Sequence, residues 1–101
     1  MSRPALWFTF GSLPKSGHIV VLSVDHTSKP SDKVISERKV EAFGEKAHDA
    51  VCETICLYKG RQRRFKAEFK KFLRHVGVPE YKLQEVLLKF ANETERILNS
   101  R

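Results

Sequence analysis

The stretch that most constrains the fold lies between Gly60 and Gly77, where apolar residues recur at the spacing of one helix face. At about 100° of rotation per residue, a single narrow stripe collects Phe65, Phe69, Phe72, Leu73 and Val76. Gly77 suits the left-handed residue that follows a helix, and Pro79 suits the first turn of the next helix. The sequence therefore predicts a helix over residues 61–76 that packs by its apolar stripe.

The polar side of this expected helix is almost uniformly basic. Residues 59–75 hold eight Lys and Arg side chains against the single acid Glu68, and the rest of the chain is neutral overall. The stretch therefore accounts for the whole net charge of +7. Like charges four residues apart, as in Lys66–Lys70 and Lys70–Arg74, destabilise a helix by roughly 0.2–0.5 kcal/mol per pair. A face that accepts this cost indicates an anionic partner.

The arrangement of these charges predicts the class of partner. A line of mixed Lys and Arg suits the phosphates of a nucleic-acid backbone. No Asn, Gln or Asp is interleaved on that face to read base edges, and no known nucleic-acid-binding signature is present. We therefore expect a non-enzymatic protein that binds DNA or RNA without strong sequence preference. The expected contacts are Arg63, Arg64, Lys66, Lys70, Lys71 and Arg74.

The same charges also suit a different class of protein. An interaction module, such as an inhibitor or adaptor, would dock its basic helix on an acidic protein surface. Trp7, Tyr81 and Leu88 would then add apolar anchors. Tyr81 and Leu88 fall outside the apolar stripe of their segment, seven residues apart, which also suits a homodimer contact.

The remaining segments predict an α+β fold. Residues 5–10 and 18–24 are rich in aromatic and β-branched side chains and read as an antiparallel β-hairpin. Residues 34–43 fit neither period and are either a third strand or the start of a helix. The helical period returns from residue 45, which predicts a helix over 45–58.

A final helix is expected after Pro79, packed antiparallel against the 61–76 helix. Its apolar face comprises Leu83, Val86, Leu87, Phe90, Ala91, Thr94, Ile97 and Leu98. At 101 residues, the chain 1–101 is expected to form one domain with two or three helices after the hairpin.

Trp7 has three candidate environments. With Ile19 and Val21 it forms an apolar side of the expected hairpin. We expect the 45–58 helix to cover this side, and the alternatives are a dimer patch and a surface on which nucleic-acid bases stack.

The composition favours a cytoplasmic protein without a membrane partner. No apolar run reaches the roughly 20 residues that a membrane span needs. The start, residues 1–13, has an early Arg and an apolar patch but lacks a secretory cleavage site. Two cysteines four residues apart do not form a disulfide framework, which favours a reducing compartment.

One row of residues is a candidate metal site. His48, Cys52 and Cys56 recur every four residues, a row that could bind zinc with one further histidine. Structural zinc sites usually pair close cysteines on loops, so we expect ordinary thiols and no metal or other cofactor. The further histidine would be His18, His26 or His75.

Enzymatic motifs are missing from the sequence. It has no phosphate-cradling glycine loop and no nucleophile elbow. Asp25 and His26 in a polar loop leave nuclease-like proton transfer as the minor alternative.

Overall fold

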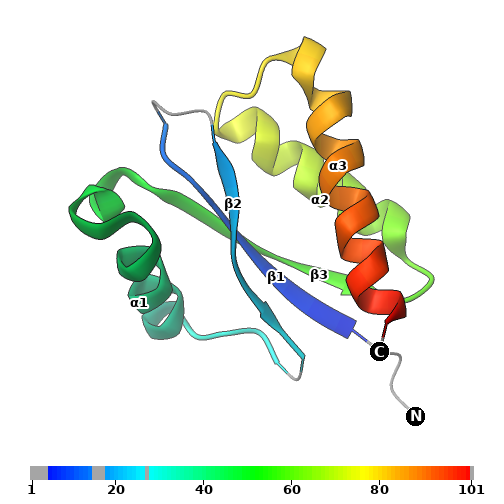
Figure 1. The fold of residues 1–101 in the computed structure, drawn as a ribbon, viewed down its shortest axis with the longest axis horizontal. Helices are drawn as coiled ribbons and strands as arrows, with labels where there is room; N and C mark the ends of the chain where they lie inside the picture. The colour runs from blue at the N-terminus through cyan, green and yellow to red at the C-terminus, as the bar shows by residue number, and fades with distance from the viewer. Residues whose placement is uncertain (1–4, 15–17, 27, 101) are drawn as a thin grey trace.

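A computed structural model describes residues 5–14, 18–26 and 28–100, which form a three-stranded antiparallel sheet with helices on both sides. The strand order is β2-β1-β3, so β1 is the central strand. Figure 1 shows α1 on one side of the sheet and the α2–α3 pair on the other. The elements are β1 (Ala5–Ser12), β2 (Ile19–Asp25), α1 (Asp32–Phe43), the 3-10 helix η1 (Gly44–Asp49), β3 (Val51–Tyr58), α2 (Gln62–His75) and α3 (Glu80–Asn99). The expected α+β fold is confirmed.

The core lies between the sheet and the α2–α3 pair. Because successive side chains of a strand point to opposite faces, Leu6, Phe8 and Phe10 of β1 all enter it. The ring of Phe10 stacks on Phe69 of α2 at a centroid distance of 4.5 Å and meets Phe90 of α3 edge-on. The fully buried side chains of this core also include Ile55, Leu57, Phe65, Leu73 and Leu83.

The boundary between α2 and α3 follows the expectation from the sequence. Gly77 has a φ of 88°, the left-handed conformation that glycine adopts most easily. Its N–H donates to the carbonyl of Arg74, and the N–H of Val78 donates to the carbonyl of Leu73. These two bonds form a Schellman motif, which satisfies carbonyls left free at the end of α2. Pro79 then precedes the first turn of α3.

The helix expected over residues 45–58 is wrong. This segment forms the 3-10 helix η1 and then β3, whose eight residues all pair with β1. Its alternation also fits a strand, since Ile55 and Leu57 are buried while Cys56 and Tyr58, which follow them, are more exposed. Tertiary pairing with a buried central strand therefore overrides a helical period that the local sequence permits equally well.

The ambiguous residues 34–43 form most of α1. Ser31 begins this helix as the N-cap, and its Oγ accepts a hydrogen bond from the Val34 N–H at 3.3 Å. None of the residues of α1 is fully buried. At its C-terminal end the Phe43 ring lies over Gly11 of β1, where a Cβ atom would stand only 3.0 Å from the ring.

A β-bulge changes the faces predicted for the hairpin. Thr9 pairs with Ser23 and Phe10 with Val21, so β2 contains one extra residue at this point. Ile19 and Val24 consequently both pack against the core, although simple alternation puts them on opposite faces. The predicted grouping of Trp7 with Ile19 and Val21 is therefore wrong, because Trp7 lies on the opposite face of the sheet.

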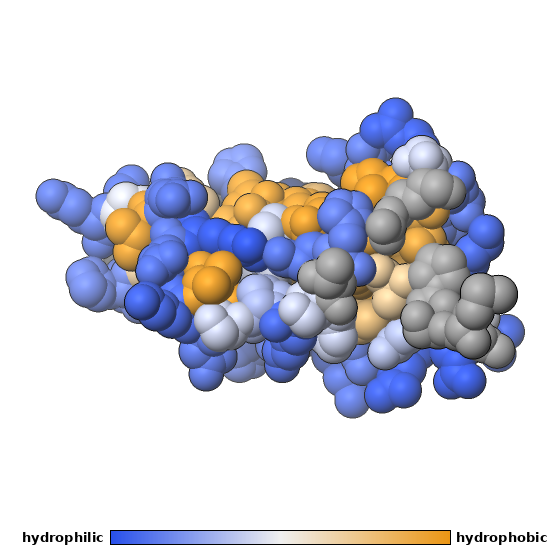
Figure 2. Space-filling view, turned by 90° about the horizontal axis from the view of Figure 1, so that it is seen from below, coloured by the Kyte–Doolittle hydropathy of each residue, from blue (hydrophilic) through white to orange (hydrophobic). Residues whose placement is uncertain are grey.

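The helices leave part of the sheet surface open. Seen from below, the molecule exposes hydrophobic patches in its middle and toward both ends, separated by hydrophilic side chains (Figure 2). Among the described residues, every helix is too short or too polar to span a bilayer. Residues 1–4 of the signal-like start lie outside the described residues.

Candidate functional site

The six basic residues singled out from the sequence all lie on α2, on the sides that the buried stripe leaves free. We call them the α2 basic face. Four are exposed, and Lys66 and Lys70 are half-buried. The set comprises Arg63, Arg64, Lys66, Lys70, Lys71 and Arg74.

Acids of α3 reach this face, which the sequence interpretation did not foresee. The Lys66 ammonium lies 3.7 Å from a carboxylate oxygen of Glu95, and Arg74 Nε lies 3.0 Å from Glu80. Glu68 is therefore not the only acid that relieves the repulsion within α2. Such exposed pairs contribute little stability, so a phosphate can replace the carboxylate at small cost.

Three members of the α2 basic face remain without an ion pair in the described part of the chain: Arg63, Lys70 and Lys71. Arg64 pairs with Glu68 at 3.5 Å within the helix. The free positive charge thus lies mainly away from α3, along the outer side of α2 and the side that faces the sheet.

A hollow of about 550 Å³ lies along the β3 edge of the sheet and is lined by residues of α2, β3 and β1. Because β3 is an edge strand, its outer side faces this hollow directly. The lining residues are Trp7, Glu53, Thr54, Cys56, Tyr58, Arg61, Arg64, Glu68, Lys71, Phe72 and His75. Only three of the predicted site residues line it, namely Trp7, Arg64 and Lys71.

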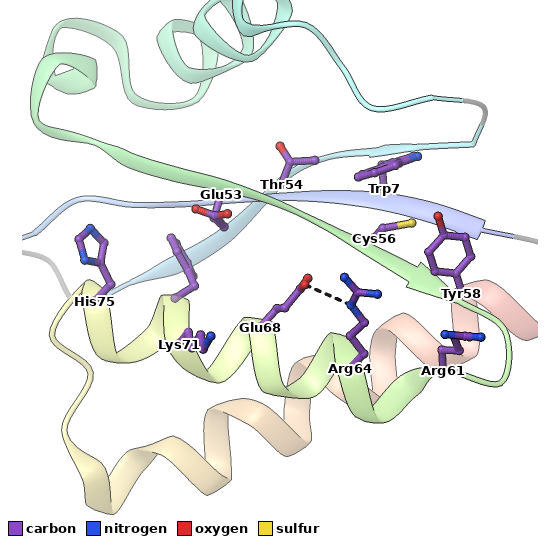
Figure 3. Close-up of a pocket in the computed structure, with 11 residues that line it drawn as sticks. Trp7, Glu53, Thr54, Cys56, Tyr58, Arg61, Arg64, Glu68, Lys71 and His75 are labelled. Atoms are coloured by element: carbon purple, nitrogen blue, oxygen red, sulfur yellow. Dashed lines mark ion pairs between the residues drawn. The ribbon is translucent and has the colours of Figure 1, made fainter.

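The two ends of the hollow differ in chemistry. Figure 3 shows Cys56, Tyr58, Arg61 and Arg64 gathered at one end with Trp7 above them, and Glu53 and His75 toward the other. Glu68 lies between the ends and is turned toward Arg64. The first end, which we call the aromatic end, is the one that combines rings with guanidinium groups.

The groups at the aromatic end that could carry negative charge stay neutral near pH 7. Burial raises the pKa of the Cys56 thiol. The hydrogen bond with Cys56 is the main cause that raises the pKa of Tyr58. A protonated thiol is a poor nucleophile, so this end is better suited to binding than to covalent chemistry.

Sequence reasoning missed Tyr58 and Arg61 as site residues. The sequence predicts Tyr58 at the end of the 45–58 helix and Arg61 at the start of the 61–76 helix, whereas both belong to a tight turn from β3 into α2. In this turn the Arg61 N–H donates to the Tyr58 carbonyl at 2.9 Å, and Gly60 adopts a φ of 87°. The "YKGR" sequence at residues 58–61 was the available signal, because a glycine between two periodic segments marks a turn.

The row of candidate zinc ligands predicted on one helix face does not form. Cys52 and Cys56 lie on a strand, where residues four apart are separated by about 13 Å. His48 lies in η1. Among the described residues, no group of three or more His, Cys, Asp or Glu is placed to hold a metal ion.

The Asp25–His26 pair lies away from the α2 basic face. Both carboxylate oxygens of Asp25 accept hydrogen bonds from Arg38 of α1. The Arg38 hydrogen bond is the first cause that lowers the pKa of Asp25. This carboxylate is thus engaged in holding α1 to β2.

Tyr81 and Leu88 are exposed on α3, by 80% and 63%. They do not line the hollow that Trp7 lines. The three predicted partner contacts therefore do not form one surface.

The chain matches no protein-family model, no curated protein and no solved structure.

Proposed function

We propose that this protein binds nucleic acid through the phosphate backbone, with the α2 basic face as the contact surface. The observation that supports the proposal most is the placement of charge. The whole net charge of +7 comes from residues 59–75, and their basic side chains lie at the surface around one helix. A single positive face of this kind raises the rate of encounter with a polyanion and orients it on arrival.

The length of the face fits a short run of phosphates. Arg63 and Arg74 are eleven positions apart, which corresponds to about 16 Å along a helix. Nucleotides of one strand rise by about 3.4 Å each, so about four or five phosphates fit alongside. Arg64 and Lys71 at the hollow and Lys66 on the α3 side extend the face around the helix.

An acidic protein surface is the second candidate partner. The exposed side chains of Tyr81 and Leu88 favour it, because an aromatic and an aliphatic anchor are typical of protein interfaces. Their place on α3, outside the hollow, would require the partner to contact both helices of the pair.

Salt dependence is the first test of the nucleic-acid proposal. A labelled oligonucleotide is titrated with protein by fluorescence anisotropy at several salt concentrations. With about four to six phosphate contacts, the slope of log K against log salt should be roughly −4 to −5. Binding should weaken by on the order of 10² to 10³ between about 50 and 200 mM salt.

A charge-reversal pair locates the contacts. The variant Arg63→Glu with Lys70→Glu changes two groups that form no ion pair in the described structure. It should flatten the salt slope by about two and weaken binding to every sequence alike. The matched control, Lys33→Glu with Lys46→Glu, has the same net charge and changes exposed residues of α1 and η1. Equal effects of both variants, or no binding by the wild type in low salt, would contradict the proposal.

A further inference from the structure

Two aromatic side chains of the sheet stay out of the core. Trp7 alternates with the buried Leu6 and Phe8, so it points to the opposite face and is only half-buried. Tyr58 at the end of β3 is 39% exposed. The ring-to-ring contacts of the described residues join phenylalanines, and none of them involves Trp7 or Tyr58.

The register of the sheet brings these two rings together. Trp7 pairs with Cys56, and Ala5 pairs with Tyr58, so Trp7 and Tyr58 are diagonal neighbours on adjacent strands. Diagonal neighbours on one face lie about 7–8 Å apart, within reach of large side chains. Both line the aromatic end of the hollow at the β3 edge of the sheet (Figure 3).

Two guanidinium groups lie beside these rings. The turn bond from the Arg61 N–H to the Tyr58 carbonyl holds Arg61 close to the end of β3. Arg64 lies in the first turn of α2 and lines the same end of the hollow. Arg64 belongs to the α2 basic face, so the aromatic end continues that face toward the sheet.

We propose that the aromatic end binds an unpaired base by stacking on Trp7 and Tyr58, while Arg61 and Arg64 bind its flanking phosphates. The protein would then prefer single-stranded nucleic acid to duplex. This inference rests on the proposed binding of the phosphate backbone by α2. The bases of a duplex are stacked on one another and cannot reach the rings, whereas an unpaired base can turn out onto them.

The charge at this end selects nucleic acid over a second copy of the chain. A second copy of the chain carries the same net charge of +7, so charge repulsion opposes its approach to this positive end. A single strand instead brings a negative phosphate with each base. The ring of the base also covers the apolar surface that the neutral side chains of Tyr58 and Cys56 present.

The single tryptophan makes this contact measurable. Trp7 is the only Trp of the chain, so its emission reports on the aromatic end alone. The protein is titrated with oligothymidylate, with an abasic strand that has the same number of phosphates, and with a duplex of equal length. Oligouridylate serves as the RNA arm. We expect oligothymidylate or oligouridylate to quench Trp7 and to bind about 10-fold more tightly than the abasic strand.

A matched pair of tyrosine variants separates stacking from general effects. Tyr58→Ser should weaken single-strand binding by about 10-fold and leave the salt slope unchanged, because no phosphate contact is removed. Tyr81→Ser is the control, since Tyr81 is also exposed but lies outside the hollow. It should bind like the wild type. Both variants alter exposed positions, so the fold is expected to persist, and circular dichroism checks this directly.

The outcomes distinguish this inference from the proposed function. If the base-containing and abasic strands bind alike with no change in Trp7 emission, the stacking site is wrong and backbone binding by α2 stands. Equal loss of binding in Tyr58→Ser and Tyr81→Ser would also overturn the stacking site. If none of the strands binds in low salt, both proposals fail.

Discussion

Arg38 of α1 donates hydrogen bonds from both terminal nitrogens to the two carboxylate oxygens of Asp25 at the end of β2, at 2.7 and 3.0 Å. Ser23 on the same strand joins this pair, accepting from Arg38 and donating to Asp25 at 3.2 Å. Because α1 contains no fully buried residue, this polar cluster and the Phe43 ring account for much of its attachment to the sheet.

Removal of the Asp25 charge should loosen α1 in a pH-dependent way. The Arg38 hydrogen bond lowers the pKa of Asp25 from its ordinary value of 3.8, so the contribution of the pair to stability is fully present above 3.8. It is lost as the pH falls below 3.8 through the lowered pKa. We expect Asp25→Asn to reduce the free energy of unfolding by about 1–2 kcal/mol at pH 7. Urea denaturation of both proteins at neutral and strongly acidic pH checks this, and a difference that does not shrink in acid would contradict it.

The close approach of α1 to β1 gives a second prediction. A Cβ at Gly11 would lie 3.0 Å from the Phe43 ring and 3.1 Å from Leu22, so both side chains must move. We expect Gly11→Ala to lower the free energy of unfolding by about 1–3 kcal/mol through overpacking. Combining it with Phe43→Leu should cost less than the sum of the two single changes, because the smaller side chain makes room. If the two losses in unfolding free energy are additive in thermal or urea unfolding, the contact with the Phe43 ring does not cause the destabilisation by Gly11→Ala.

The aromatic core gives a third prediction. Phe69 is fully buried and its ring stacks on Phe10 across the interface of α2 with the sheet. We expect Phe69→Ala to lower the free energy of unfolding by about 3–5 kcal/mol, a large share of the total for a small domain. Phe69→Leu should cost clearly less, because it leaves a smaller cavity. Similar losses of unfolding free energy for both variants in chemical unfolding would indicate that the contribution of Phe69 to stability does not depend on the volume that it fills.

The helices α2 and α3 could be predicted from the sequence because the residues that define them are close together in the chain. The stripe from Phe65 to Val76 and the glycine and proline that follow it determine where α2 ends and α3 begins. Residues 51–58 carry no such signal, since their apolar positions fit a strand and a helix alike. Their assignment depends on pairing with β1, which is distant in sequence.

The candidate site was less predictable than the helix that carries most of it. The basic side of α2 follows from helical geometry, but Glu80 and Glu95 approach it only because α3 packs alongside. The hollow forms only because β3 is an edge strand. Which side chains of β2 face the core depends on a β-bulge, and no residue type in β2 predicts that bulge. Trp7 was a predicted contact and lines the hollow, whereas the placement of Tyr58 and Arg61 beside it depends on the turn that Gly60 permits.

Because an acidic residue of α3 contacts only one of two lysines of the α2 basic face, charge reversal at these two lysines should affect stability differently. Lys66 lies 3.7 Å from Glu95. Lys66→Glu gains one opposite-charge pair with Lys70 but loses the Glu95 contact and brings two carboxylates together, so it should be less stable than Lys70→Glu by roughly 0.2–0.5 kcal/mol. Lys70→Glu instead creates opposite-charge pairs four residues from Lys66 and Arg74 and should be neutral or stabilising by a similar amount. Thermal unfolding in low and high salt measures both. Identical melting temperatures for the two variants in low salt would rule out the Glu95 contact as a significant interaction.

Tyr81 and Leu88 together predict weak self-association at most. They lie seven residues apart on one side of α3 and are both well exposed. Two side chains offer much less surface than the roughly 800 Å² per partner that a stable interface buries. We therefore expect any dimer through α3 to form only at high protein concentration, as a gradual rise in apparent mass in sedimentation velocity. Tyr81→Ala with Leu88→Glu should keep the fold and abolish that rise, because it removes the apolar contact and adds a charge. A wild type that stays monomeric at the highest concentration would leave these residues without a role in self-association, and a dimer unaffected by the double variant would place the interface elsewhere.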